Sequence, residues 1–200
     1  LAPGFSTVNT PSIQRVRRKY GLSGRYVVFV GTLGRRKNII RLTEAFLKAD
    51  IASDTSLVLV GRPDNAFEDL ARVLGTQGNN KRVRILGTPP DIDMPGLIGG
   101  ADLLALVSLY EGFGVPVLEG MACGVACLIS NRCSLVSLAG PAGYVVEPED
   151  VDDIATGLTE IFDDSKLRRQ LGDAGRRRAV EYSWERTANQ TWAIYENVLK

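Results

Sequence analysis

The sequence contains no histidine in its 200 residues and only three cysteines. Because histidine is the commonest general base near neutral pH and the usual nitrogen ligand of zinc, its absence excludes Ser-His-Asp catalysis and argues against a zinc site. Cys123, Cys127 and Cys133 form no C-x-x-C pair, so neither a disulfide framework nor a metal knuckle is indicated. We predict that these three residues are small, reduced members of the core.

Long apolar runs and an excess of charge of one sign are also missing. No apolar run reaches the ~18 residues of a membrane span, and no signal peptide is evident. These absences favour a cytoplasmic protein. The net charge of +1 argues against a dedicated nucleic-acid-binding protein. Leu1-Ala2-Pro3-Gly4 lacks an initiator methionine, so we expect a domain cut from a longer chain, with residues 1–10 a linker remnant.

Short apolar runs alternate with segments of helical periodicity along the chain. The apolar runs predict buried strands at residues 26–30, 56–60, 83–86, 103–107, 125–130 and 144–146. Helical periods cover residues 10–20, 38–48, 66–74, 94–99, 117–123, 150–162, 165–182 and 183–199. This alternation predicts an α/β fold, with one domain over residues 1–200 built on a Rossmann-like, doubly wound parallel sheet of about six strands.

The first predicted helix carries Arg15, Arg17, Arg18 and Lys19 on the face opposite its apolar residues. Such a face is most often solvated. A patch that associates peripherally with the inner face of a membrane is the alternative.

Open sheets of this kind bind ligands outside the carboxyl ends of their strands, which selects the loops at 31–38, 87–93 and 108–115. In the first loop, Arg35, Arg36 and Lys37 stand where a helix should begin, and positive charge is unfavourable at that end of the helix dipole. Spacing alone leaves two interpretations open: three cations in water, or a phosphate bound among them.

Glu111 and Glu119 enclose the run Gly-Phe-Gly-Val-Pro at a separation of eight residues. Glu111 by itself could offset the dipole of the following helix, and Glu119 by itself would be a surface acid. Small Gly120 and Cys123 beside Glu119 leave room for a bulky group. Because glycines let a ligand approach the backbone and a helix start attracts anions, the stretch predicts a site for a phosphorylated sugar donor.

The run from Ser108 to Val125 reads SLYEGFGVPVLEGMACGV and resembles the E-x7-E signature of retaining glycosyltransferase family four. Val30-Gly31-Thr32-Leu33 with Arg36-Lys37-Asn38 resembles the phosphate loop of the same family. Other segments that fit are Ala101-Asp102-Leu103, Tyr182-Ser183-Trp184-Glu185 and the final helix with Tyr195. The resemblance covers the chain from about residue 11 onward. It implies the C-terminal, donor-binding half of a GT-B enzyme, with residues 183–199 as a terminal helix that crosses back toward the other half.

The resemblance also implies roles for individual residues. Glu111 would be the catalytic residue and act against the donor sugar or its phosphate-linked region. Glu119 would accept hydrogen bonds from the ribose hydroxyls, which suits an acceptor-only carboxylate. Backbone N–H groups in the loop of Gly112, Phe113, Gly114 and Val115 would hold sugar or phosphate oxygens.

The remaining implied contacts come from two other loops. Arg36 and Lys37, in the loop that begins at Gly31 and Thr32, would neutralise the diphosphate, including the charge that grows on the leaving group. Thr88 and Pro89 would contact the base, largely through the backbone.

In this family the leaving phosphate is pictured as departing on the face that the acceptor attacks, and as helping to deprotonate that acceptor. The resemblance thus implies transfer from a nucleotide-diphosphate sugar, with mannosyl-type donors favoured, to a glycan or lipid-linked acceptor. No cofactor and no metal are implied, and Asp91-Ile92-Asp93 is expected to supply helix-capping acids rather than a metal site. The implied partner is an N-terminal acceptor domain, and residues 1–200 alone should bind donor but transfer sugar poorly.

Other classes fit the sequence less well. A nicotinamide-dependent dehydrogenase would need G-x-G-x-x-G after a strand, a spacing that Gly31-Thr32-Leu33-Gly34 lacks, and no G-K-[ST] of a P-loop occurs. Epimerases share the GT-B architecture, but the pair of acids together with the Arg-Lys loop looks like the transferases. A non-enzymatic domain that senses or binds a nucleotide sugar remains the alternative.

Overall fold

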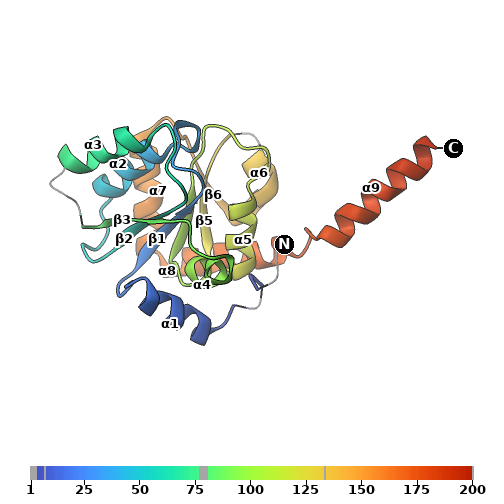
Figure 1. Ribbon diagram of the computed structural model, residues 1–200, viewed down its shortest axis with the longest axis horizontal. Helices are drawn as coiled ribbons and strands as arrows, with labels where there is room; N and C mark the ends of the chain where they lie inside the picture. The colour runs from blue at the N-terminus through green and yellow to red at the C-terminus, as the bar shows by residue number, and fades with distance from the viewer. Residues whose placement is uncertain (1–3, 7, 77–80, 133, 200) are drawn as a thin grey trace.

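The computed structural model describes residues 4–6, 8–76, 81–132 and 134–199, and in this part of the chain six strands form one sheet (Figure 1). All neighbouring strands pair in parallel, in the order β3-β2-β1-β4-β5-β6. The strands are β1 (Tyr26–Val30), β2 (Ser56–Val60), β3 (Val83–Gly87), β4 (Leu103–Leu106), β5 (Ala126–Ser130) and β6 (Gly143–Val146). The predicted parallel sheet is confirmed.

Helices connect the strands and cover both faces of the sheet. They are α1 (Thr10–Lys19), α2 (Ile39–Lys48), α3 (Phe67–Thr76), α4 (Met94–Gly99), α5 (Val115–Cys123), α6 (Ser134–Ala139), α7 (Val151–Asp163), α8 (Ser165–Ala179) and α9 (Trp184–Val198). Single turns of 3₁₀-helix are η1 (Arg35–Lys37), η2 (Asp91–Asp93) and η3 (Gly140–Ala142). The sequence did not predict α6, a helix of only six residues.

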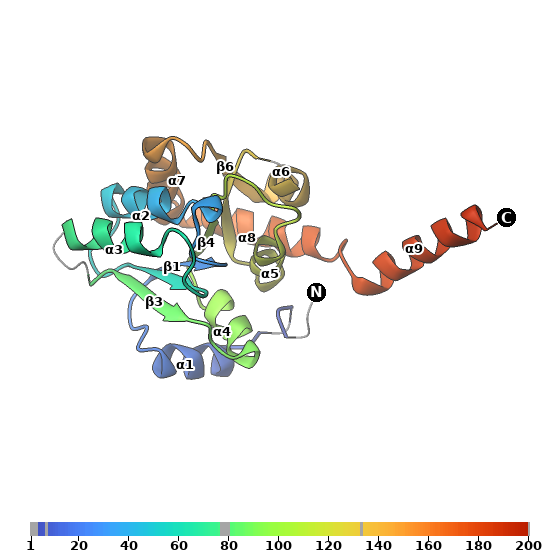
Figure 2. The same cartoon turned by 45° about the horizontal axis from the view of Figure 1, so that its top comes forward.

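Two layers of helices enclose the sheet (Figure 2). Helices α2, α3 and α7 pack together on one face, and α1, α4, α5 and α8 pack on the other. This double cover explains why the central strands are apolar without alternation, since both of their faces lie in the core. Cys127 lies in β5 and Cys123 in α5, and both are free and buried as predicted, whereas Cys133 lies outside the described residues.

The strand order reverses between β1 and β4, which lie side by side in the middle of the sheet. The chain leaves β1 toward β2 and β3, and it leaves β4 toward β5 and β6. The loops that follow β1 and β4 therefore diverge to opposite faces, and the crevice between them is where open α/β sheets bind ligands.

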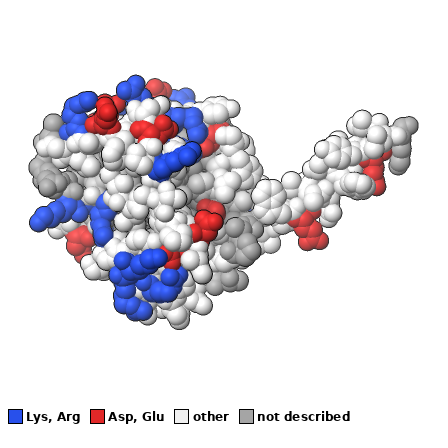
Figure 3. Space-filling view, in the orientation of Figure 1, with Lys and Arg blue, Asp and Glu red and all other residues white. Residues whose placement is uncertain are grey.

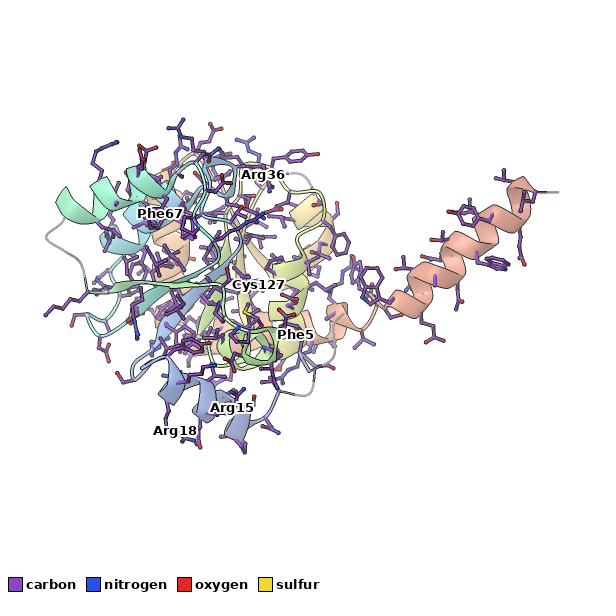
Figure 4. All side chains as sticks on the ribbon, viewed as in Figure 1. Phe5, Arg15, Arg18, Arg36, Phe67 and Cys127 are labelled. Atoms are coloured by element: carbon purple, nitrogen blue, oxygen red, sulfur yellow. The ribbon has the colours of Figure 1, made fainter. Side chains whose placement is uncertain are left out.

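The basic face of α1 is not simply solvated as predicted. Arg15 and Lys19 contact the carboxylate of Asp93 at 2.7 and 2.6 Å, and the side chain of Asp93 is fully buried. The Tyr20 hydroxyl donates a third hydrogen bond to the same carboxylate at 2.8 Å. The expected cap is therefore wrong for Asp93, which makes no capping hydrogen bond to α4, because the cations of α1 occupy its oxygens. Arg18 makes no such contact and points into solvent (Figure 4).

Helix α9 projects away from the body of the molecule (Figures 1 and 2). Ser183 caps its start, as its side chain accepts a hydrogen bond from the Arg186 N–H at 3.0 Å. None of its described residues is buried, and Trp184 and Trp192 are 73% and 64% exposed. No helix in the described ranges is long and apolar enough to cross a membrane.

Candidate functional site

The loops after β1 and β4 meet at the carboxyl edge of the sheet, as the strand order requires. The Leu109 N–H donates to the Arg36 carbonyl at 2.9 Å, and the Arg36 guanidinium donates to the Tyr110 carbonyl at 2.7 Å. The structure thus brings together the cationic loop and the first acid of the Glu111–Glu119 pair, although they lie more than 70 residues apart in the sequence.

Glu111 is held by cations. Its Oε1 accepts hydrogen bonds from the Lys37 ammonium and, at 2.8 Å, from the Ser108 hydroxyl. The Arg36 guanidinium lies 3.5 Å from its Oε2. The side chains of Lys37 and Glu111 are only 10% and 8% exposed, so this ion pair is largely removed from water. Among the described residues, Oε2 accepts only this longer contact from Arg36.

Two further polar residues fix this arrangement: Asn38, which belongs to the loop that the resemblance covers, and Ser130, which the sequence did not single out. Asn38 adopts a left-handed conformation, and its side-chain amide donates to the Val107 and Pro148 carbonyls at 3.0 and 2.6 Å. The Ser130 hydroxyl donates to the Ser108 carbonyl at 2.7 Å. The signal for Ser130 was weak, because it is a single polar residue at the end of the predicted strand 125–130. The conformation of Asn38 is in keeping with its residue type, since asparagine tolerates the left-handed region better than most residues.

Beside the ion pair, an open cleft of about 1040 Å³ runs along the carboxyl ends of β1, β2 and β3. The face seen in Figure 3 is hollowed near its centre. Of the predicted site residues, the cleft is lined by Gly31, Thr32, Thr88, Pro89 and Glu119. The other predicted residues, from Arg36 and Lys37 to the loop of Glu111–Val115, do not line the cleft.

The wall of the cleft depends on Gly61. Its φ is +150°, and a Cβ atom there would lie 1.8 Å from the Gly31 carbonyl oxygen. The Gly31 N–H also donates to the Val60 carbonyl at 2.9 Å, so the loops after β1 and β2 abut directly. A larger residue at position 61 would have to push these loops apart.

Glu119 lies in the second turn of α5 and faces the cleft half-buried. Burial, with a smaller contribution from the nearby Asp91 carboxylate, raises the pKa of Glu119 to about 7. Its carboxylate has no hydrogen-bond or ion-pair partner among the described residues. The expectation that Gly120 leaves room beside it is wrong, since a Cβ atom at Gly120 would meet Leu104 and Cys127 on the sheet side of the helix.

The loop between the two acids is partly exposed. Gly112, Phe113 and Val115 are exposed, whereas Gly114 is buried with a φ of +94° and precedes the first residue of α5. No described residue accepts a hydrogen bond from the N–H groups of Phe113 and Gly114. The Phe113 ring makes an edge-to-face contact with Tyr182 at a centroid distance of 5.9 Å, which fixes the loop against the chain between α8 and α9.

The described side chains at this edge of the sheet offer groups that suit an organic phosphate. Within the described ranges, no group of three or more acidic or thiol side chains is placed so that it could hold a metal ion. The site instead combines paired cations, open backbone N–H groups and a carboxylate without a partner. Together these can bind phosphates and hydroxyl groups.

Known proteins resemble this chain over most of its length. The model of the family glycosyl transferases group 1 matches residues 12–178. O-antigen chain mannosyltransferase B of Escherichia coli is 34% identical over 184 residues, which cover 90% of this chain and 48% of that protein. MMP alpha-(1->4)-mannosyltransferase of Mycolicibacterium hassiacum is 34% identical over 169 residues, 82% of this chain and 40% of that protein. The chain thus spans half or less of the length of these relatives.

A solved structure shares the fold. HepE of Anabaena, crystallised in complex with UDP and glucose, has a TM-score of 0.85 and 21% sequence identity, over 97% of this chain and 54% of HepE. At this identity the likeness concerns the fold, and it confirms the predicted GT-B domain. The family match over residues 12–178 settles the relationship: the chain belongs to the glycosyl transferases group 1 family.

Proposed function

We propose that this chain is the donor-binding half of a retaining glycosyltransferase that moves a sugar, of mannosyl type, from a nucleotide-diphosphate sugar to a glycan or lipid-linked acceptor. The observation that carries the proposal is the buried Lys37–Glu111 pair beside an open cleft that also contains the partnerless carboxylate of Glu119. The two mannosyltransferases among the relatives support the choice of sugar.

Glu119 has the properties that a ribose ligand requires. It faces the cleft, it has no described partner, and its carboxylate can accept two hydroxyl donors. Thr88 and Pro89 line the same cleft and would contact the base. Ribose and base would therefore occupy the cleft.

The diphosphate would lie toward Gly31 and Thr32, next to Arg36 and Lys37. A Cβ atom at Gly31 would lie 3.3 Å from the Lys37 side chain. This wall of the cleft therefore lies next to the lysine side chain. The open N–H groups of Phe113 and Gly114 would bind oxygens of the sugar or phosphate. Glu111, held by Lys37 and Ser108, would present Oε2 to the donor sugar.

The reaction then needs no protein nucleophile. The bond between the anomeric carbon and the phosphate oxygen breaks with its electron pair on the phosphate, and the acceptor oxygen bonds to the same face of that carbon. The departing phosphate takes the acceptor proton. Arg36 and Lys37 would stabilise the charge that grows on the leaving oxygen, and because they are fixed before the reaction, little reorganisation is required.

The acceptor would be bound by an N-terminal domain of the same enzyme. The relatives are about twice as long as the matched region, which leaves room for such a domain in those proteins. We therefore propose that residues 1–200 bind donor but transfer sugar poorly. Appreciable transfer by these residues alone would contradict that part of the proposal.

Calorimetric titration of the chain with UDP, GDP, ADP and their sugar conjugates tests the function. At least one nucleotide should bind. Arg36→Ala should lower the affinity for nucleoside diphosphates and leave the affinity for nucleosides unchanged, because the guanidinium would contact only the phosphates. Failure of every nucleotide to bind the parent would refute the donor-binding role. Binding without turnover by a longer chain that includes the N-terminal domain would favour a sensor instead.

A further inference from the structure

The charges that line the cleft are separated. Among the described lining residues, the charged side chains are Arg62, Asp91 and Glu119. The two acids lie close enough for Asp91 to affect the pKa of Glu119. Arg62 follows β2 and pairs with neither acid. A bound anion would be repelled from the acidic part of the cleft and attracted toward Arg62.

Within the described part of the chain the guanidinium of Arg62 has no partner, in contrast to the cations of the neighbouring loop. Arg35 contacts Asp69 at 3.1 Å, while Arg36 and Lys37 share Glu111. No described residue accepts a hydrogen bond from the exposed Arg62 side chain or forms an ion pair with it. Arg62 therefore presents a full set of donors to the cleft.

The backbone fixes Arg62 beside the cationic loop. The Leu33 N–H donates to the Arg62 carbonyl at 2.9 Å, and Gly61 abuts Gly31 so closely that no side chain fits between them. Arg62 consequently adjoins Thr32, on the part of the wall that lies next to Lys37. Arg62 thus lines the same end of the cleft as Gly31, next to which the buried Lys37 side chain lies.

We propose that Arg62 is a further binding residue for the diphosphate of the donor, in addition to Arg36 and Lys37. The inference rests on the proposed function. Arg36 and Lys37 share the negative charge of Glu111, which leaves one net positive charge for two phosphate groups, and Arg62 supplies a second. Its planar guanidinium can donate two parallel hydrogen bonds to phosphate oxygens. This role could not be predicted from the sequence, because Arg62 lies outside the three loops selected at the carboxyl ends of the strands.

Titration calorimetry of the full chain with uridine, UMP and UDP, and with the matching guanosine and adenosine series, tests the proposal. Arg62→Ala should weaken the tightest-binding diphosphate about tenfold, the loss expected for a charge-assisted hydrogen bond. The affinity for the nucleoside should not change. Arg62→Lys should recover part of the loss, because lysine keeps the charge but not the paired donors.

Arg18→Ala is the matched control, since it removes the same charge from an exposed, partnerless arginine on α1 (Figure 4). It should bind every ligand as the parent does. If the Arg18 and Arg62 variants lost the same affinity for the diphosphate, the cause would be the change in net charge. If Arg62→Ala lost the same affinity for nucleoside and diphosphate, Arg62 would contact the base or the ribose rather than the phosphates. Either result, or parent-like binding by Arg62→Ala, overturns the role of Arg62 and leaves donor binding intact. A parent chain that binds no nucleotide overturns both.

Discussion

Glu111 and Glu119 belong to one motif, yet their surroundings are opposite. Glu111 is compensated by Lys37, Arg36 and Ser108 and is fixed in a buried network. Glu119 faces a cleft with no described partner, and burial raises its pKa to about 7. The difference teaches that one acid already has its counter-ions within the chain, whereas the other has none among the described residues, which is why we propose that it receives hydrogen bonds from a ligand.

The largest effect should follow from breaking the Glu111 network. Glu111→Leu leaves the Lys37 ammonium buried without its partner, and we expect the free energy of unfolding to fall by about 3 kcal/mol. Urea denaturation measures the change. Lys37→Met combined with Glu111→Leu should recover a large part of the loss, because it removes the uncompensated charge. A Glu111→Leu variant as stable as the parent would show that the pair contributes nothing.

A smaller effect should appear at Glu119 and should depend on pH. The pKa of the Glu119 carboxyl is 4.5 in the unfolded chain and about 7 in the folded chain. Between these pH values the folded chain therefore binds more protons than the unfolded chain. The free energy of unfolding should therefore fall as pH rises from about 4.5 to about 7, by on the order of 1 kcal/mol once solvent screening is allowed for.

Glu119→Gln is the control for this pH dependence, because glutamine has nearly the same shape and does not ionise. Urea denaturation at pH 5 and pH 8 should give a smaller loss of stability in the variant than in the parent. The other acidic groups titrate in the same way in both proteins, so their contributions cancel when the two losses of unfolding free energy are compared. Equal losses in the two proteins would mean that Glu119 keeps its ordinary pKa.

The smallest effect should come from the contact that fixes the loop between the acids. Tyr182→Ala removes the ring that packs on Phe113 at 5.9 Å and that also lies 5.3 Å from the Arg178 guanidinium. We expect a loss of about 1 kcal/mol in unfolding free energy. Tyr182→Phe keeps the ring and should be close to the parent in thermal and urea unfolding. If the alanine and phenylalanine variants lost equal stability, the hydroxyl rather than the ring would matter.

The fold could be predicted from the sequence because the patterns that indicate strands and helices are local and recur along the chain. Continuous apolar runs predicted the strands, and helical stripes such as that of α2 predicted the helices that cover them. Helix α6 was not predicted, although α4, which is equally short, was. The resemblance implied that α9 crosses toward another half of the enzyme and is in part exposed, but its apolar stripe alone could not predict that none of its described residues is buried.

The candidate site was less predictable, because its energetics depend on contacts between distant residues. Spacing located both acids and the cationic loop, but it could not tell that Lys37 would bind Glu111 while Arg62 remained without a partner. Asp93 illustrates the same difficulty. Its position predicted a helix cap, but the residues that occupy its carboxylate come from α1, more than 70 positions earlier.

Removal of the ribose hydroxyls tests the central claim, that Glu119 receives the ribose of a nucleotide donor. Calorimetry would compare the tightest-binding nucleoside diphosphate with its 2′,3′-dideoxy analogue, in the parent and in Glu119→Ala. The parent should lose about tenfold in affinity without the hydroxyls, as expected for hydrogen bonds to a charged group. Glu119→Ala should bind the two ligands equally. An undiminished preference for the ribose in Glu119→Ala would contradict the claim.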